Sequence, residues 1–197
     1  MEVDWRKEAA SRLDKERFIH TLGVEEMAVA LAQQYGADEE KASIAALGHD
    51  LFRQMGYPSL LALAEEWGMD VAHYLTVGLL HGPVAATYLC HMGITDGEIL
   101  DAVYYHTTGR KGMTLLDHII YVADKCEKNR DYPGVEGLRT LAQENLPFAT
   151  YTILKRAVQR RRQKGQPIEE DSLLALSELE ESMAPFLAQE GGTDFDE

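Results

Sequence analysis

The pair His49-Asp50 ends an apolar run that begins at Ala45, and it places two side chains of the metal-ligating type next to each other. A polar group on an apolar face costs about 2–7 kcal/mol unless a partner satisfies it. A divalent metal ion would be such a partner, because it binds imidazole nitrogen and carboxylate oxygen together. The pair alone is a weak signal, since adjacent His and Asp residues are common by chance.

Three more residues of these types continue apolar stripes at helical spacing: His20, His106 and Asp124. A single histidine on such a stripe is more often a hydrogen-bonded structural residue than a ligand. Burying all of these groups without a common partner would be costly, however. Their joint inward placement therefore favours one metal site, which separate elements must converge to form.

A fourth histidine, His81, stands before Gly82-Pro83, which we interpret as a break between two helices. On this interpretation His81 lies at or just before a helix N-terminus, where unpaired N–H groups favour anions. Residues 107–112 form a polar loop with hydroxyls, glycines and two cations. Such a loop suits phosphate, although its spacing is not that of a Walker A loop.

Arginine side chains near these positions are candidate phosphate clamps, because guanidinium binds phosphate in bidentate fashion. The three candidates are Arg53, Arg110 and Arg130. The alternative for each is a surface ion pair that contributes at most about 1 kcal/mol. The basic run 160–162 ends an expected helix, and we interpret it as a solvated helix terminus rather than a binding patch.

The elements that must position these residues are helices, since no segment shows the alternation of a strand. We expect an all-α fold of eight or so helices. The clearest segments are 17–35, 115–127, 135–144 and 147–164, with shorter helices at 60–67, 70–80, 83–91 and 173–187. Gly36 is expected to end the helix 17–35. Asp38 is expected to cap the helix that follows it, and either Thr95 or Asp96 to cap a later helix.

The charge is unevenly distributed. Residues 166–197 hold ten acidic and no basic residues, so only −4 of the net charge of −14 belongs to residues 1–165. We therefore expect a domain over 1–165 and an acidic C-terminal extension over 166–197, helical in part and disordered at its end, 191–197. This balance argues against a nucleic-acid partner but leaves room for a small anionic substrate.

Further features exclude other classes. No apolar run reaches the roughly 20 residues that cross a bilayer, and the first residues lack the apolar core of a signal peptide. Cys90 and Cys126 are interpreted as free thiols of a reducing compartment. We expect a cytoplasmic protein without a membrane partner, and a homodimer is plausible because closed dimers are common among soluble oligomers.

The chain resembles the HD-domain metal-dependent phosphohydrolases, whose signature is H…HD…D. The matching residues occur in the same order along the sequence and on separate expected helices: His20, His49-Asp50 and Asp124. The segments 17–24, 81–83, 105–109, 121–125 and 129–134 are similar to one branch of these phosphohydrolases, the YqeK-type bacterial proteins. The resemblance extends from residue 17 to 162. It implies an HD-domain helical bundle that cleaves diadenosine tetraphosphate symmetrically into two ADP molecules, with iron as the metal. The stretch Cys126-Glu127-Lys128 departs from the pattern and leaves the local loop shape open.

The resemblance also implies roles for single residues. The metal ligands would be His20, His49, Asp50 and Asp124, holding one or two ions of iron, or of manganese, cobalt or zinc. His81 and His106 match positions that hold a second metal or contact phosphate, and with Asp50 they are the expected catalytic residues. The expected substrate-binding residues are Arg17, His20, Arg53, His81, His106, Thr107, Thr108, Arg110, Asn129 and Arg130. Alternatives are a phosphohydrolase for another nucleotide, such as a nucleoside monophosphate or a cyclic nucleotide, and a non-catalytic metal- or nucleotide-binding module.

Overall fold

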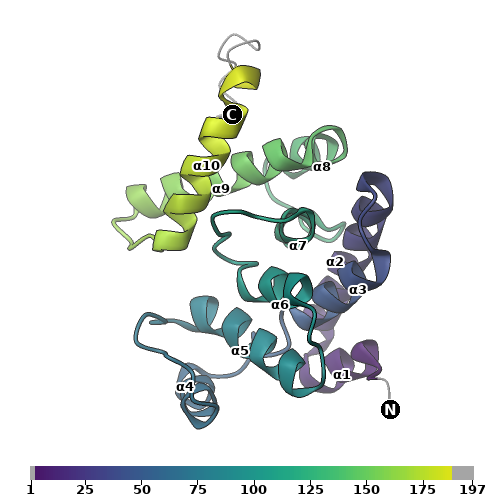
Figure 1. The fold of residues 1–197 in the computed structure, drawn as a ribbon, viewed down its shortest axis with the longest axis vertical. Helices are drawn as coiled ribbons and strands as arrows, with labels where there is room; N and C mark the ends of the chain where they lie inside the picture. Colours follow the sequence, from purple (N-terminus) through teal and green to yellow (C-terminus); the bar gives the residue numbers. More distant parts are fainter. Residues whose placement is uncertain (1–2, 188–197) are drawn as a thin grey trace.

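The computed structural model describes residues 3–187, and this part of the chain forms ten α-helices and no strand (Figure 1). The all-α prediction is therefore confirmed. The expected disorder of 191–197 lies outside the described residues. In chain order the helices are α1 (Trp5–Arg12), α2 (Lys15–Tyr35), α3 (Glu39–Gly48), α4 (Tyr57–Glu66), α5 (Val77–His91), α6 (Gly97–Tyr104), α7 (Leu115–Cys126), α8 (Val135–Glu144), α9 (Leu146–Gln163) and α10 (Glu170–Leu187).

Several helices begin and end at residues whose types favour it. The side chains of Asp38 and Asp96 accept backbone N–H groups in the first turns of α3 and α6. Thr114 forms a capping box with Asp117 at the start of α7. Gly36 ends α2 in the left-handed conformation, with φ 75°, which costs a glycine little.

The predicted break at Gly82-Pro83 is wrong, because α5 runs without interruption from Val77 to His91. An internal proline costs a helix about 3 kcal/mol. Here the helix buries one long apolar face, including Leu80, Val84 and Leu89, and this burial outweighs the loss. His81 consequently lies inside a helix and not at an N-terminus. No helix forms over 70–76, and α4 begins at Tyr57, one turn earlier than expected.

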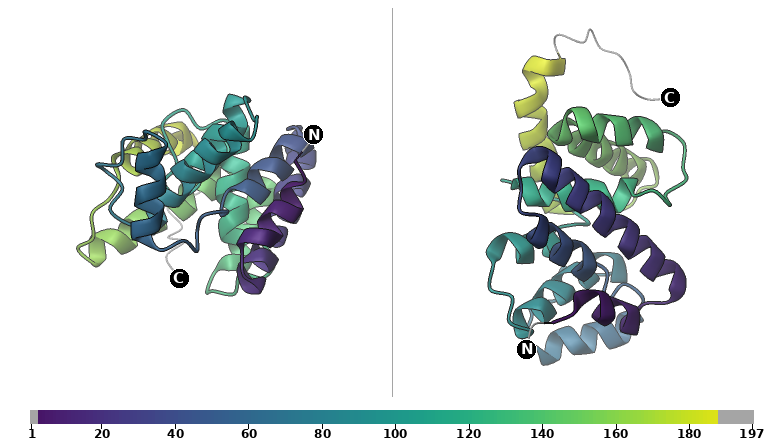
Figure 2. Two further views of the ribbon diagram at one scale, coloured as in Figure 1. Left: turned by 90° about the horizontal axis from the view of Figure 1, so that it is seen from below. Right: turned by 90° about the vertical axis from the view of Figure 1, so that its right-hand side faces the viewer.

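α7 is the central helix, and ten of its 12 residues are buried. It packs against α2, α3, α6, α8 and α9, so that helices distant in sequence meet around it. Figure 2 shows the same arrangement from two other sides, with α4 at one end of the molecule and α8 and α9 at the other. Within the described residues no helix combines the length and the apolar character needed to traverse a membrane.

The helical part of the acidic extension, α10, packs against α9. Its residues Ala175, Leu176 and Leu179 are buried in the common core. Ser172 at its start donates a hydrogen bond to the backbone carbonyl of Thr108, at 2.8 Å. α10 therefore covers the loop between α6 and α7, while the boundary at residue 165 stays a prediction.

Candidate metal centre

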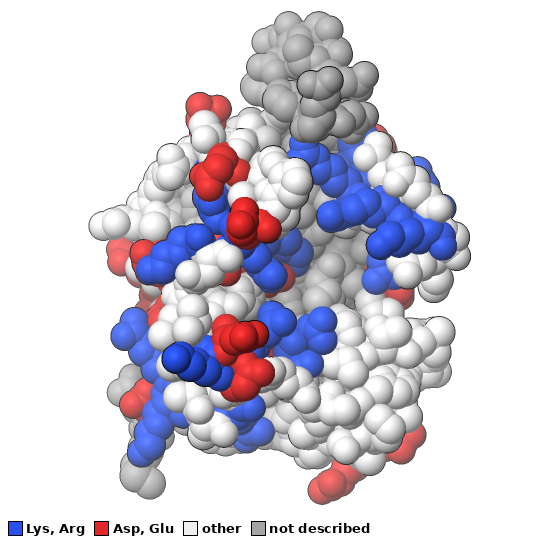
Figure 3. All heavy atoms as spheres, turned by 180° about the vertical axis from the view of Figure 1, so that it is seen from behind, with Lys and Arg blue, Asp and Glu red and all other residues white. Residues whose placement is uncertain are grey.

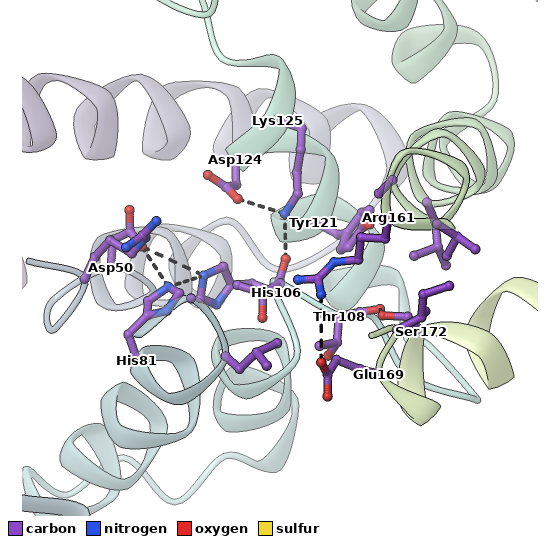
Figure 4. Close-up of a pocket in the computed structure, with 18 of the residues that line it drawn as sticks. Asp50, His81, His106, Thr108, Tyr121, Asp124, Lys125, Arg161, Glu169 and Ser172 are labelled. Atoms are coloured by element: carbon purple, nitrogen blue, oxygen red, sulfur yellow. Dashed lines mark hydrogen bonds and ion pairs between the residues drawn. The ribbon is translucent and has the colours of Figure 1, made fainter. Parts of the chain in front are cut away.

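Four histidines and two aspartates from five parts of the chain meet in one buried cluster: His20, His49, Asp50, His81, His106 and Asp124. His20 comes from α2, and the doublet follows α3 directly. His81 lies on α5, His106 just after α6, and Asp124 on α7. Figure 4 shows Asp50, His81, His106 and Asp124 around a single space. The convergence expected from their helical positions is therefore present in the fold.

Asp50 lies between two pairs of histidines. Its Oδ2 is 3.5 Å from His49 Nε2 and 3.8 Å from His20 Nε2. Its Oδ1 is 3.1 Å from His81 Nε2 and 3.9 Å from His106 Nε2. In each set of three residues the potential ligand atoms lie within 4.8 Å of one another, which is the spacing of a metal site.

Asp124 closes the first of these sets. Its Oδ1 is 3.1 Å from His20 Nε2 and 3.8 Å from His49 Nε2. Two cations hold the same carboxylate from outside, with Lys125 Nζ 2.8 Å from Oδ2 and Arg130 Nη2 3.0 Å from Oδ1. Asp124 therefore adds a second carboxylate beside the two imidazoles of the first set.

Backbone carbonyls fix the orientation of three of the rings. His49 Nδ1 lies 2.6 Å from the carbonyl oxygen of Ala46, and His81 Nδ1 lies 2.8 Å from that of Val77. In His106, Nδ1 lies 2.7 Å from the carbonyl of Val103. A carbonyl only accepts hydrogen bonds, so Nδ1 carries the proton and the lone pair of the neutral ring is on Nε2. All three lone pairs face the cluster, as metal ligation requires.

His20 is oriented by a carboxylate instead. Its Nδ1 is 3.1 Å from Glu127 Oε1, and Glu127 is only 1% exposed. The other oxygen of Glu127 accepts the backbone and side-chain N–H groups of Asn129. A Cβ at position 23 would collide with that same oxygen, so Gly23 makes the room for Glu127. This carboxylate–histidine arrangement is the outer support that metal-ligating histidines ordinarily have.

The donor set passes a simple test for a cation. His49 Nε2 is fully buried and has no hydrogen-bond partner among the described residues. His81 Nε2 and His106 Nε2 are 3.0 Å apart, although both rings carry their proton on Nδ1. Two lone pairs at that separation repel unless a positive charge lies between or beside them. The residues therefore fit a divalent metal ion.

The pKa values follow the same charges. Burial alone would raise the pKa of Asp50 and of Asp124. The histidines His49 and His81 lower the pKa of Asp50 well below its usual range, and Lys125 and His20 do the same for Asp124. Burial would lower the pKa of His49, yet the negative charge of Asp50 raises it. Burial lowers the pKa of His106 well below its usual range. The carboxylates thus stay ionised and attract a cation to the histidine nitrogens.

A cavity of about 330 Å³ opens from this cluster toward α9 and the start of α10. Five cationic side chains line it: Arg17, Arg53, Lys125, Arg130 and Arg161. Arg17 Nη1 lies 3.0 Å from Asp50 Oδ2. Figure 3 shows a face of the molecule on which Lys and Arg side chains border a hollow. Cations around a buried metal-type cluster make the cavity suitable for phosphate groups.

The structure brings together most of the residues that we predicted for the substrate. Those that line the cavity or the cluster are Arg17, His20, Arg53, His81, His106, Thr107, Thr108 and Arg130. Arg110 does not line it, because Asp117 binds its guanidinium through two hydrogen bonds and Asp101 lies 3.3 Å away. Asn129 supports Glu127 and does not reach the cavity.

Sequence reasoning missed three functional positions. Glu127 was noted only as a departure from the family pattern, and Lys125 only as part of a matching string. Arg161, expected to be solvated, lines the cavity together with Ser172 of α10. The signal for Arg161 was weak, since a basic run at a helix end has an ordinary explanation and the packing of α10 was not visible.

Comparison with known proteins agrees with this geometry. The HD domain family matches residues 17–129, more than half of the chain. The chain therefore belongs to the HD-domain family.

Its relatives within that family include symmetrical bis(5′-nucleosyl)-tetraphosphatases. One from Bacillus subtilis (strain 168) is 41% identical over 172 residues, which cover 85% of this chain and 91% of the relative. Another from Halalkalibacterium halodurans is 40% identical over 170 residues, covering 85% and 90%. The crystal structure of a predicted HD superfamily hydrolase involved in NAD metabolism from Clostridium acetobutylicum has a TM-score of 0.86 at 31% identity. It covers 90% of this chain and 96% of that one. The predicted HD-domain bundle is confirmed.

Proposed function

We propose that this protein is a metal-dependent hydrolase that cleaves diadenosine tetraphosphate symmetrically into two ADP molecules. One observation carries the proposal. A chain about 40% identical to symmetrical bis(5′-nucleosyl)-tetraphosphatases over most of its length also gathers His and Asp ligands beneath a cation-lined cavity. The relatives support the substrate, and the cluster supports the chemistry.

The residues that would hold the metal are His20, His49, Asp50 and Asp124; the closeness of Asp124 Oδ1 to His20 Nε2 and His49 Nε2, and of Asp50 Oδ2 to His49 Nε2, supports this set. A divalent ion bound there would supply Lewis acidity that activates water and polarises the phosphate. In the reaction, the water oxygen bonds to one central phosphorus. The bridging oxygen leaves with the other ADP half, and the protons of water are released to nearby bases and solvent.

Asp50 and the pair His81 and His106 are the proposed catalytic residues. With Nδ1 held by a backbone carbonyl, each ring has only Nε2 available toward the cavity. That nitrogen can take a proton or bind a second ion, and once protonated it can donate a hydrogen bond to a phosphate oxygen. Asp50 is shared between the two histidine sets. The count of metal ions in His81→Ala distinguishes these roles, since loss of one ion of two would assign His81 as a ligand.

The walls of the cavity suit one nucleotide half of the substrate. Arg53, Lys125, Arg130 and Arg161 supply positive charge for the phosphates. Leu154 and Val158 of α9 line the same cavity together with Ile168, and Ser172 adds a hydroxyl. An apolar slot with a few polar groups is the usual composition of a nucleoside site.

Product analysis tests the proposal. Metal-loaded protein is incubated with diadenosine tetraphosphate, and the nucleotides are separated by ion-exchange chromatography over time. ADP as the only product supports symmetrical cleavage. AMP together with ATP would mean cleavage at another bond, and absence of turnover in metal-loaded protein would contradict an enzyme for this substrate.

We further propose iron as the metal, a reducing cytoplasm as the compartment and a homodimer as the assembly. Mixed histidine and carboxylate ligation supports iron, manganese, cobalt or zinc over magnesium alone. Metal analysis of protein purified without added metal or chelator tests the first point. Sedimentation at several protein concentrations tests the assembly.

A further inference from the structure

A second cavity, of about 270 Å³, begins at the same three residues as the first: Asp124, Lys125 and Arg130. It extends between the loop that follows α7 and the helices α8 and α9. Its floor is apolar, with Pro133, Leu138 and Ile153 among the lining residues. The two cavities therefore diverge from the Asp124 side of the metal-type cluster.

α9 forms the wall between the two cavities. Leu154, Ala157, Val158 and Arg161 line the first cavity, at offsets 0, 3, 4 and 7. Ile153, Arg156 and Arg160 line the second, at offsets 0, 3 and 7. Each set is one face of a helix with 3.6 residues per turn. One helix thus presents a cationic group at its C-terminal end to each cavity.

Charge distinguishes the second cavity from another one beside His20. Four cationic side chains line it, namely Lys125, Arg130, Arg156 and Arg160, and Asp124 is its only acid. The cavity beside His20 is lined by Asp14, Glu16 and Glu127 against two arginines. Phosphate oxygens are therefore favoured in the second cavity and disfavoured in the cavity beside His20.

Tyr132 gives the second cavity an aromatic wall. Its hydroxyl donates a hydrogen bond to the backbone carbonyl of Lys125, at 2.9 Å, which fixes the ring beside the cations. The side chain of Arg160 is exposed, and no carboxylate among the described residues forms an ion pair with it. An arginine without a carboxylate partner, beside a fixed ring and an apolar floor, matches a phosphate followed by a base.

We propose that this second cavity binds the other nucleoside diphosphate half of the dinucleotide, the half that leaves. The inference rests on the proposed function, because a symmetrical substrate has two ADP halves that diverge from the attacked phosphorus. The first cavity takes one half, and the second takes the other between Arg156, Arg160 and the ring of Tyr132. Each chain then has two ADP sites, on two different faces of α9.

Calorimetric titration of ADP into metal-loaded protein counts these sites without any turnover. We expect two ADP molecules per chain in the wild type, one in Arg160→Glu and a second site about tenfold weaker in Arg160→Ala. Arg162→Glu is the matched control, since Arg162 is exposed on the same helix end and lines neither cavity. It should keep both sites. One ADP in the wild type, or two of unchanged affinity in Arg160→Glu, would overturn the proposal.

Kinetics separate this inference from the proposed function. In Arg160→Glu we expect the KM for diadenosine tetraphosphate to rise about tenfold, with Arg162→Glu within about twofold of the wild type. If the wild type cleaves the substrate and both variants behave alike, the subsite is wrong and the function stands. If the wild type does not cleave it, the function is wrong, and the ADP count still decides whether the second cavity is a nucleotide site. The ADP that remains bound in Arg160→Glu shows that this variant is folded.

Discussion

Asp50 is the residue on which the site depends most, because its two oxygens face different pairs of histidines. Removing its charge takes a ligand from both sets at once. In Asp50→Asn we expect metal affinity and turnover each to fall by more than about 100-fold, beyond the usual effect of losing an outer support. Metal analysis and product formation measure this. Asp131→Asn, the same change at an exposed loop position, should leave metal affinity and turnover unchanged. Full activity in Asp50→Asn would contradict the proposal that Asp50 serves both histidine sets.

Glu127 acts through His20 and is a positioning residue. Without its carboxylate, the Nδ1–H of His20 loses its buried partner and the ring can turn. We expect Glu127→Ala to bind metal about 10–100-fold more weakly, as measured by competition with a chelating dye. Glu127→Gln keeps one acceptor oxygen and should lose less. Wild-type affinity in the alanine variant would show that His20 is oriented by something else.

At the level of helices, Gly82 sets how closely α5 approaches the end of α6. A Cβ there would lie 2.9 Å from the backbone oxygen of Tyr104 and 3.0 Å from that of Val103. Backbone cannot move aside cheaply, so Gly82→Ala should cost about 1–3 kcal/mol and lower the melting temperature by about 3–10 °C. Activity should fall too, since His106 Cε1 lies 3.2 Å from the added carbon.

Gly137→Ala is the matched control for this effect. Gly137 lies inside α8, and an added Cβ there meets nothing within 4 Å. We expect a gain of about 0.5–1 kcal/mol, because alanine loses less backbone entropy in a helix. Equal effects of the two substitutions in thermal unfolding would mean that the contact between α5 and α6 is not tight.

The packing of α7 on α9 makes stability depend on pH through His118. The ring contacts Thr150 Oγ1 at 2.9 Å, and burial lowers its pKa to about 4, against a small opposing effect of Glu178. The unfolded chain takes up this proton near pH 6.5, and the folded chain does not. The free energy of unfolding should therefore fall by about 3 kcal/mol as the pH drops from about 6.5 to about 4.

Urea unfolding at several pH values, with His118→Asn as the comparison, isolates this contribution from those of other groups. Asparagine has no proton to gain, so the variant should lose less stability over the same pH range. Parallel pH profiles for the two proteins would show that His118 is protonated equally in the folded and unfolded chains.

At the scale of the whole molecule, a metal ion would join α2 and the end of α3 to α7, which is distant from both in sequence. A ligand that binds only the folded chain stabilises it by about 2.7 kcal/mol at a concentration 100 times its Kd. For a chain of this size that corresponds to a rise in melting temperature of about 5–10 °C. Calorimetry with and without a strong chelator measures the difference, and identical melting temperatures would argue against a bound ion.

The convergence of the proposed ligands could be predicted from the sequence because each one interrupts an apolar stripe, as His20 and Asp124 do in their helices. Helix ends were predictable where a cap is local, as at Asp38 and Gly36. The rest depends on packing between distant segments. Pro83 remains inside a helix because of a buried face, Arg110 turns to Asp117, and Arg161 meets α10 across the cavity. None of these contacts leaves a periodic trace in the chain.

Diffraction from crystals of metal-loaded protein, measured at the absorption edge of the bound metal, tests the central claim most directly. We predict an anomalous peak within about 2.0–2.3 Å of ligand atoms of His20, His49, Asp50 and Asp124. A peak elsewhere in the molecule, or no peak in protein that still cleaves diadenosine tetraphosphate, would contradict the account.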